Sequence, residues 1–288
     1  MKRVLSVWFT VGLLFSGLFM ASANLAMANI LITPTRVELG DRDRGTRLSV
    51  VNTSNKTKTY RIFWREQAQT PDGEYIRLES NQRLKGLKPV SRLMRFSPSQ
   101  ITLAPGERQH IRFAVRRPAN LAEGEYRSYL VFEALPDEEK EERQGDRGAS
   151  FQLKLNLSFS IPVILRQGEP DVAVKFLEAQ PVKRLINSEY KYGVDLKMSR
   201  KGISSSLGNV KIFWKPDAGG AERQMGILNG LPIYTESPGR NIAIGMPEMT
   251  ASEDGTLRVI YEGDGVYEGI VFDEHIAKVK ASDFIVQE

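Results

Sequence analysis

The sequence of 288 residues contains no cysteine, only two histidines, and hardly any stretch with helical periodicity. Without cysteine, the chain has neither a disulfide bond nor a thiol nucleophile. His110 and His275 lie far apart and in no spacing typical of a metal site or a catalytic triad. We therefore expect a protein that is not an enzyme, with no catalytic residue, no metal, no cofactor and no small-molecule substrate.

The chain also lacks a strong charge of one sign, since its formal net charge is +5. Removal of an N-terminal segment that carries Lys2, Arg3 and no acidic residue would lower this value to +3. The excess is spread along the chain, so it does not by itself indicate nucleic acid or a membrane surface as a partner.

The N-terminal segment is arranged like a secretory signal. Two basic residues precede an apolar run from Val4 to Met20, and small residues follow at Ala26 and Ala28. We expect a signal peptide at 1–28. Cleavage after Ala23 and retention as a membrane anchor are the alternatives. A secreted chain without disulfides suits a bacterial periplasm, which is the predicted localisation.

The rest of the chain is predicted to be all-β, as two immunoglobulin-like sandwiches. About seven short strands at spacings near ten residues fill 29–167, and the breaker cluster Gly168 to Pro170 precedes a second, smaller sandwich at 168–288. The first strand, Ile30 to Leu39, contains Pro34, which confines it to a sheet edge or to a switch between sheets. The strands at 48–52 and 60–65 are predicted to form a hairpin, with Tyr60, Ile62 and Trp64 on one face.

The most regular alternation of the chain runs from Ser150 to Pro162, where every second residue is large and apolar and the residues between them are polar. Because side chains of a strand alternate between two faces, this strand needs an apolar surface on one side only. The charged run at 137–147 precedes it, has no apolar residue, and is expected to be mobile. The strand is either an ordinary sandwich strand or a strand that pairs with another chain.

Two cations in strands are candidate binding residues. Arg36 follows Pro34 and shares a face with Glu38, so it is either a solvated edge charge or an anchor for a carboxylate. Lys154, within the regular strand, has the same two interpretations.

Several motifs resemble the periplasmic pilus chaperones of the PapD-like family. They are Thr33-Pro34-Thr35-Arg36-Val37, Val50-Val51-Asn52-Thr53-Ser54, Leu103-Ala104-Pro105-Gly106-Glu107, Tyr126-Arg127-Ser128-Tyr129-Leu130-Val131-Phe132 and Ile161-Pro162-Val163. The likeness covers 29–167 in good order and is weaker over the second half.

This resemblance implies two sandwiches in a boomerang arrangement that stabilise pilus subunits and deliver them to an outer-membrane usher. The chaperone lends a strand to the open groove of the subunit, and here the donated side chains would be Phe151, Leu153, Leu155 and Leu157. The family also holds the terminal carboxylate of the subunit with an arginine and a lysine. Arg36 falls on the arginine position.

The family's lysine does not transfer cleanly to this chain. Its position falls near Leu157 or Ser158, and the strand has Lys154 as its only lysine. The anchor is therefore Arg36 with Lys154, or Arg36 with a different partner, or the cleft of this chain is arranged differently from that of the family.

The sequence thus predicts a periplasmic chaperone of pilus or fimbrial subunits, with self-association in the free state as a consequence of its apolar edge. The alternative is a binding or adhesion module of the cell envelope that donates no strand. Such a module would carry aromatic platforms at loop tips, whereas Trp64 and Trp214 lie in predicted strands. A hydrolase would need a clustered acid and base, which the sequence does not show.

Overall fold

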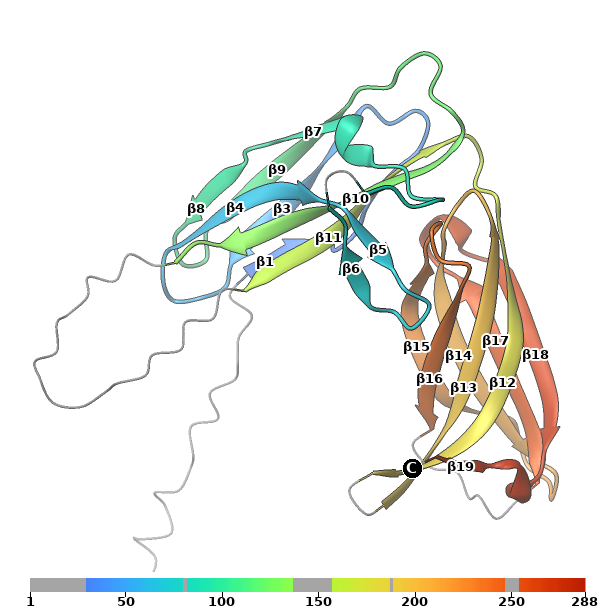
Figure 1. Ribbon diagram of the computed structural model, residues 1–288. Coiled ribbons are helices and arrows are strands. Elements are labelled where there is room, and N and C mark those ends of the chain that lie inside the picture. The colour runs from blue at the N-terminus through green and yellow to red at the C-terminus, as the bar shows by residue number, and fades with distance from the viewer. Residues whose placement is uncertain (1–29, 80–81, 137–156, 187–188, 247–253, 288) are drawn as a thin grey trace, which may run out of the picture.

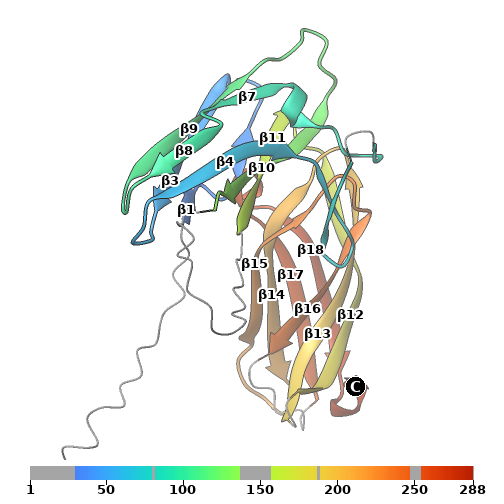
Figure 2. The same cartoon turned by 60° about the vertical axis from the view of Figure 1, so that its left-hand side comes forward.

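The computed structural model describes residues 30–79, 82–136, 157–186, 189–246 and 254–287. They form two β-sandwiches that lie at an angle to each other, as the arms of a bent molecule (Figures 1 and 2). The predicted fold class is therefore confirmed. The segment 1–28, the charged run at 137–147, and Phe151, Leu153, Lys154 and Leu155 lie outside the described residues.

The first sandwich has one sheet of four strands and one of five. In spatial order, the first sheet contains β1 (Ile30–Thr33), β3 (Gly45–Asn52), β9 (Arg108–Val115) and β7 (Met94–Ser97). The second contains β2 (Val37–Leu39), β11 (Ser158–Gln167), β10 (Gly124–Ala134), β4 (Lys58–Arg65) and β8 (Gln100–Leu103). A small hairpin is formed by β5 (Gln67–Gln69) and β6 (Tyr75–Arg77), and a single 3₁₀ turn by η1 (Val90–Arg92).

The second sandwich has two sheets of four strands. One contains β16 (Gly239–Met246), β13 (Glu189–Gly202), β12 (Val172–Ile186) and β19 (Ile285–Gln287). The other contains β15 (Arg223–Ile233), β14 (Ser206–Pro216), β17 (Gly255–Gly263) and β18 (Val271–Val279). The 3₁₀ turns are η2 (Gly265–Tyr267) and η3 (Ala281–Asp283).

Apolar residues at every second strand position form one core between the sheets of each sandwich. In β4, Tyr60 and Ile62 are buried in the first core and Trp64 packs against it, as the alternation predicted. Trp214 of β14 lies in the second core, so both tryptophans are strand residues.

The chain changes sheets at Pro34. The predicted strand from Ile30 to Leu39 is divided into β1 of the first sheet and β2 of the second, with a cis peptide bond between Thr33 and Pro34. The prediction of an edge or a sheet switch at this proline is confirmed, because a proline lacks the N–H that a continuous ladder requires.

The predicted hairpin of 48–52 and 60–65 is wrong. β3 pairs with β1 and β9, whereas β4 pairs with β10 and β8 in the other sheet. The side chain of Asn52 explains the crossing, because its amide donates to the carbonyls of Lys56 and Leu103 at 2.8 and 2.9 Å, and so binds the turn to the far sheet.

In the second sandwich the strands run longer than predicted. The sequence pattern predicts a strand only from Val172 to Leu177, whereas β12 extends to Ile186 and β13 pairs with it back to Glu189. The sequence pattern also predicts a strand from Tyr267 to Phe272, and this prediction is wrong at its start, because Tyr267 belongs to η2 and β18 begins at Val271. Within the described ranges, no helix has the length and apolar character needed to cross a membrane.

Candidate functional site at the domain junction

The strand β11 has one fully paired edge and one partly open edge. It pairs with β10 along its whole length, from Ser158 to Gln167. On its other side, among the described residues, only Val163 to Leu165 pair, in parallel with β2. The edge of Ser158 to Pro162 therefore has no described strand beside it, and its backbone groups are available to a further strand.

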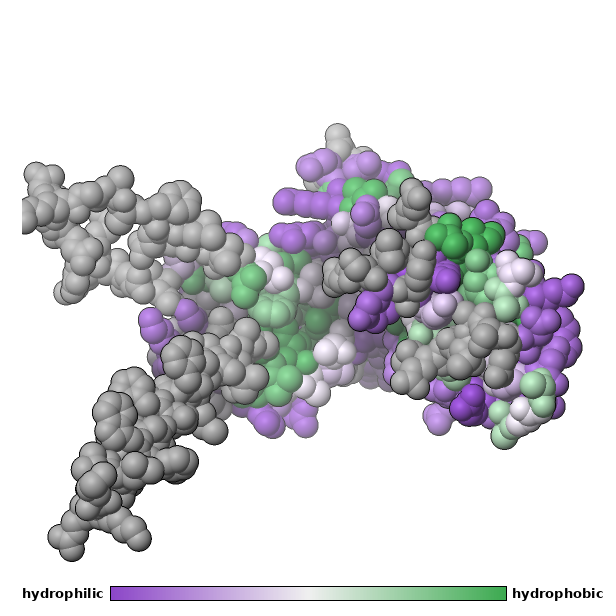
Figure 3. All heavy atoms as spheres, turned by 90° about the horizontal axis from the view of Figure 1, so that it is seen from below, coloured by the Kyte–Doolittle hydropathy of each residue, from purple (hydrophilic) through white to green (hydrophobic). Residues whose placement is uncertain are grey.

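The residue just before this open edge is apolar and exposed. Leu157 has a relative exposure of 53%, while Phe159 and Ile161, two and four positions later, pack on and in the first core. Leu157 therefore continues the core-facing row of β11 past the point where the core covers it. Seen from below, hydrophobic residues gather on this side of the first sandwich, next to the second sandwich (Figure 3).

Arg36 lies at the end of the open edge. Because Val37 of β2 is level with Val163 of β11 in a parallel pair, Arg36 comes level with Pro162. Its side chain is only 16% exposed and pairs with Glu38, and its Nη1 donates to the Tyr234 hydroxyl of the second sandwich at 3.0 Å. The terminal nitrogen Nη2 is buried and has no hydrogen-bond partner in the described part of the chain.

A chain of charged groups leads from Arg36 across three strands to the second sandwich. Glu38 also accepts from Arg166 of β11 at 3.0 and 3.3 Å. Arg166 in turn lies 3.4 Å from Glu125 of β10. Glu125 accepts from the backbone N–H and the hydroxyl of Ser205 at 3.0 and 2.6 Å. Charges of alternating sign thus join β2, β11 and β10 to the second domain.

The environment keeps these groups charged. Burial alone would lower the pKa of Arg36, but Tyr234 and Glu38 outweigh it and raise that pKa. Burial acts to raise the pKa of Glu38, but Arg36 and Arg166 outweigh it, so this pKa lies below its ordinary value. At neutral pH, Glu38 is therefore a carboxylate shared by two arginines.

A second ion pair crosses the junction directly. Arg127 of β10 donates from Nη2 to Glu236 at 2.6 Å, and the two side chains are 1% and 2% exposed. The guanidinium of Arg127 also lies 3.7 Å from the ring centre of Tyr234, which has edge contacts with Tyr75 and Tyr129. A charge this deeply buried requires its partner, so the pair ties the two domains together.

The β5–β6 hairpin reaches from the first sandwich to the second. At its turn, the backbone N–H of Asn241 donates to the Pro71 carbonyl and its side chain donates to Asp72, both at 2.8 Å. Gly73 in this turn has φ +94°, a conformation that a residue with a Cβ rarely adopts, and it lies against Arg240 of β16. The hairpin therefore holds the second sandwich from a second side.

The structure thus brings Arg36 to the junction, as one site residue predicted from the sequence. Leu157 lies next to the open edge, whereas Phe151, Leu153, Lys154 and Leu155 are not described. Sequence reasoning missed Arg127, Glu125, Arg166, Glu236 and Tyr234. The available signal was the presence of charged residues in strands that are otherwise rich in apolar ones, as in Glu125-Tyr126-Arg127.

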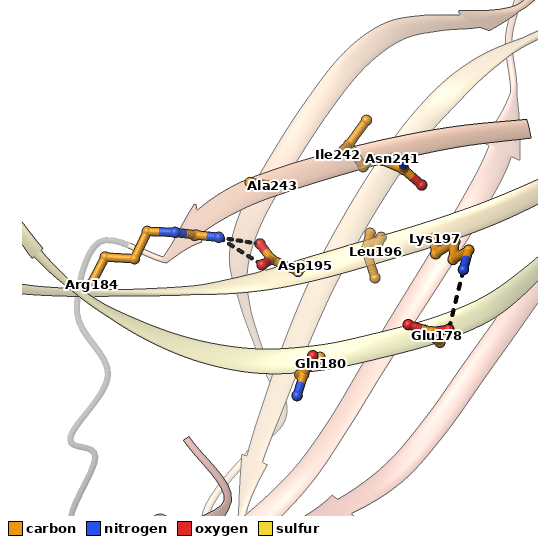
Figure 4. A pocket seen from close by; sticks show the side chains of 9 residues that line it. All are labelled: Glu178, Gln180, Arg184, Asp195, Leu196, Lys197, Asn241, Ile242 and Ala243. Carbon is orange, nitrogen blue, oxygen red and sulfur yellow. Dashed lines mark hydrogen bonds and ion pairs between the residues drawn. The ribbon is translucent and has the colours of Figure 1, made fainter. Parts of the chain in front are cut away.

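Other parts of the described chain offer less chemistry. His110 is exposed on β9 and His275 lies on β18, and no group of three or more metal-binding side chains occurs among the described residues. A groove of about 480 Å³ lies on the outer face of β12, β13 and β16 (Figure 4). Its charged side chains pair with each other, Arg184 with Asp195 and Lys197 with Glu178, as on an ordinary solvated sheet.

No protein-family model matches the chain, and no curated protein matches it by sequence. Solved chaperone structures do resemble it. The SafB chaperone of Salmonella enterica, solved with SafA pilin, is 13% identical, with 88% of this chain and 97% of that chain covered and a TM-score of 0.46. A chain of a chaperone and tip adhesin complex of CFA/I fimbriae biogenesis is 12% identical, with coverages of 87% and 98% and a TM-score of 0.45.

The CupB2 chaperone of Pseudomonas aeruginosa is 13% identical, with coverages of 86% and 100% and a TM-score of 0.41. These neighbours are chaperones, as the resemblance in the sequence led us to expect. With identities this low and TM-scores below 0.5, they assign no role to any residue of this chain, so its function has to follow from its own residues.

Proposed function

We propose that this protein is a periplasmic chaperone that binds pilus or fimbrial subunits by strand addition and delivers them to an outer-membrane usher. The observation that carries the proposal is the open edge of β11 at Ser158 to Pro162, which is the end of the most regular alternation of the chain, 150–162. A partner strand there would gain backbone hydrogen bonds along the edge.

The donated side chains would be Phe151, Leu153, Leu155 and Leu157. They precede Phe159 and Ile161 by even numbers of positions. In a continuous strand they would therefore lie on the same face and extend the apolar row of β11 beyond its own sandwich. A subunit groove that lacks a strand would remove these side chains from water, which stabilises the complex by about 25 cal/mol per Å² of apolar area.

Arg36 gives the added strand a direction. Its unpartnered Nη2 lies at the Pro162 end of the open edge, and a carboxylate that reaches this nitrogen would accept a charge-assisted hydrogen bond from it. If the C-terminal carboxylate of the subunit binds there, the added strand ends beside Pro162. It then runs past Ser158 first and is parallel to β11.

Lys154 remains a proposed second anchor. An extended chain from Lys154 to Pro162 would span about 26 Å at about 3.3 Å per residue. Lys154 would therefore reach the same carboxylate only if the chain before Leu157 turns back. Arg166 and Arg127 are nearer cations at the junction, and both are already paired with carboxylates.

The competing function is an immunoglobulin-like binding or adhesion module that donates no strand. Co-expression of the mature chain with candidate fibre subunits in a bacterial periplasm separates the two. We expect a stoichiometric complex that is lost when Leu153 and Leu155 are both replaced by serine. A chain that is recovered alone with every candidate subunit would favour the binding module.

A matched control for this experiment replaces Leu177 and Ile276 by serine. Both are apolar strand residues, of β12 and β18, that are more than half exposed, and both belong to the second sandwich, away from β11. This variant should retain the complex. If it loses the subunit as well, a general loss of apolar surface explains the result, and strand donation by 150–162 is refuted.

A further inference from the structure

The outer face of the β1-β3-β9-β7 sheet carries arginine without any counter-charge. The four strands contain four arginines and no aspartate, glutamate or lysine. Every second residue of these strands, such as Leu48, Ile111 and Phe113, points into the core. The residues between them therefore point outwards, and they include all four arginines: Arg47, Arg95, Arg108 and Arg112.

The pairing register places these side chains on one grid. Arg47 of β3 is directly opposite Arg112 of β9, and one strand further Arg112 is opposite Ser97 of β7. Arg108 is opposite Val51, and Arg95 is opposite Ala114. All four arginines are exposed, and no ion pair between described residues includes any of them.

Like charges directly opposite each other on neighbouring strands destabilise a sheet. Elsewhere in this protein, several charged residues of strands have partners of opposite charge. Arg61 of β4 is opposite Glu133 of β10 and pairs with it, and Lys211 and Arg258 of the second sandwich also have glutamate partners. The pair of Arg47 and Arg112 is therefore a cost to folding that points to a use outside the fold.

This arginine face lies away from the domain junction. The contacts with the second sandwich involve Glu125 and Arg127 of the other sheet, the β5–β6 turn, and the loop residues Arg36 and Gly86, and none of them involves a strand residue of the arginine face. The core separates the two sheets. The arginine face is therefore separate from β11 and from the domain junction, and an inference about it does not depend on the function proposed above.

We propose that the arginine face docks a second protein through a flat surface that carries carboxylates. Arginine, unlike lysine, presents a planar fork that matches a carboxylate bidentately, and arginine is enriched in protein interfaces where lysine is depleted. The distances between the arginine positions follow from sheet geometry, because neighbouring strands lie about 4.8 Å apart and residues on one face of a strand repeat about every 6.7 Å. Glutamates at alternate positions of a partner sheet repeat at the same intervals.

The residues beside the arginines also favour a protein partner over a membrane surface. Leu31 and Val51 are level with Arg108 in the same row of the face, and Thr33, Ser49 and the exposed His110 form the next row. A flat mixture of arginine, small polar and apolar side chains is typical of a protein interface. Leu31, exposed by 53%, would be covered by such a partner.

The test uses a synthetic β-hairpin peptide with glutamates at alternate positions, so that all its carboxylates lie on one face. A second peptide of the same composition divides the glutamates between both faces. We expect the first peptide to bind the full-length protein more tightly, and this binding to weaken as salt is added. Replacing Arg47 and Arg112 by glutamate should weaken it at least about tenfold.

Two variants keep this result interpretable. Lys215→Glu with Arg223→Glu changes the net charge equally at exposed positions of the second sandwich and should leave binding within about twofold. Arg47→Glu alone places a carboxylate opposite Arg112, so it should weaken binding while the melting temperature is kept or raised.

Equal loss in the second-sandwich control would refute the proposal, because net charge alone would then explain binding. Equal affinity for the two peptides would refute the idea that the spacing of the glutamates has to match the spacing of the arginines. Binding of phosphatidylglycerol vesicles that is lost with Arg47→Glu and Arg112→Glu, together with no peptide binding, would make the face a membrane surface and overturn the assignment to a protein.

Discussion

Replacing Glu236 by alanine would leave the guanidinium of Arg127 buried without its carboxylate. The two side chains are 1% and 2% exposed and their atoms lie 2.6 Å apart, so bulk solvent does not reach the guanidinium. Removal of one member of a buried ion pair costs about 3–5 kcal/mol. Glu236 also accepts from the backbone N–H of Gln69 at 2.8 Å, which loses its acceptor as well.

The contact of Arg127 with the Tyr234 ring survives the change and offsets part of this loss, so we expect a cost near the lower limit, about 3 kcal/mol. That is a large share of the 5–15 kcal/mol typical of a folded protein. Urea unfolding followed by circular dichroism measures it. The matched control is Glu133→Ala, which breaks the pair with Arg61, whose side chain is 59% exposed, and should cost at most about 1 kcal/mol.

A double variant tests whether the cost arises from the uncompensated charge. Arg127→Leu with Glu236→Leu removes both charges and fills the space with apolar groups, so it should recover most of the stability that Glu236→Ala loses. If Glu236→Ala costs no more than Glu133→Ala, the reasoning is refuted, and the pair does not hold the domains together.

Three further results are expected. Arg36→Ala should abolish recovery of the subunit while the free protein still unfolds cooperatively, because Glu38 keeps Arg166 as its partner; an unfolded variant would indicate a structural role. Since the folded-state pKa of Glu38 lies below its ordinary value of 4.5, its contribution is present above that pH and is lost as the pH falls through the folded-state pKa. The stability difference between wild type and Glu38→Gln should therefore be constant from pH 7 to about pH 5 and shrink below about pH 4.5, and a difference that grows on acidification would contradict the sign. Leu153→Ser with Leu155→Ser should leave the melting curve of the free protein nearly unchanged, whereas a large drop would place both residues in its own core.

Local pattern was sufficient for much of the fold. Strict alternation identified the core face of β4, and the proline in Thr33-Pro34 indicated the change of sheet. Alternation cannot say which sheet a strand joins, and for that reason the hairpin of 48–52 and 60–65 was wrong. The side chain of Asn52 that directs the crossing bonds to Leu103, 51 positions away.

Only those site residues could be predicted whose neighbours in the chain already indicate their role. Arg36 could be found because Pro34 and Glu38 are its neighbours in the chain. Arg127 and Glu236 are 109 positions apart, and their pairing depends on the angle between two sandwiches, which no local pattern encodes. The arginine face is a further example, since its charges come from three strands and become one surface only through the register.

The most direct test of strand addition at β11 uses the absence of cysteine from the chain. A cysteine placed at the exposed Ser158 would be the only thiol of the protein, and single cysteines can be placed along the C-terminal strand of a bound subunit. If the subunit carboxylate lies beside Pro162 and the strands are parallel, the disulfide should form at about the fifth residue from the C-terminus of the subunit. Cross-linking at the terminal residue itself, or a stable complex with no cross-link at any position, would contradict the account.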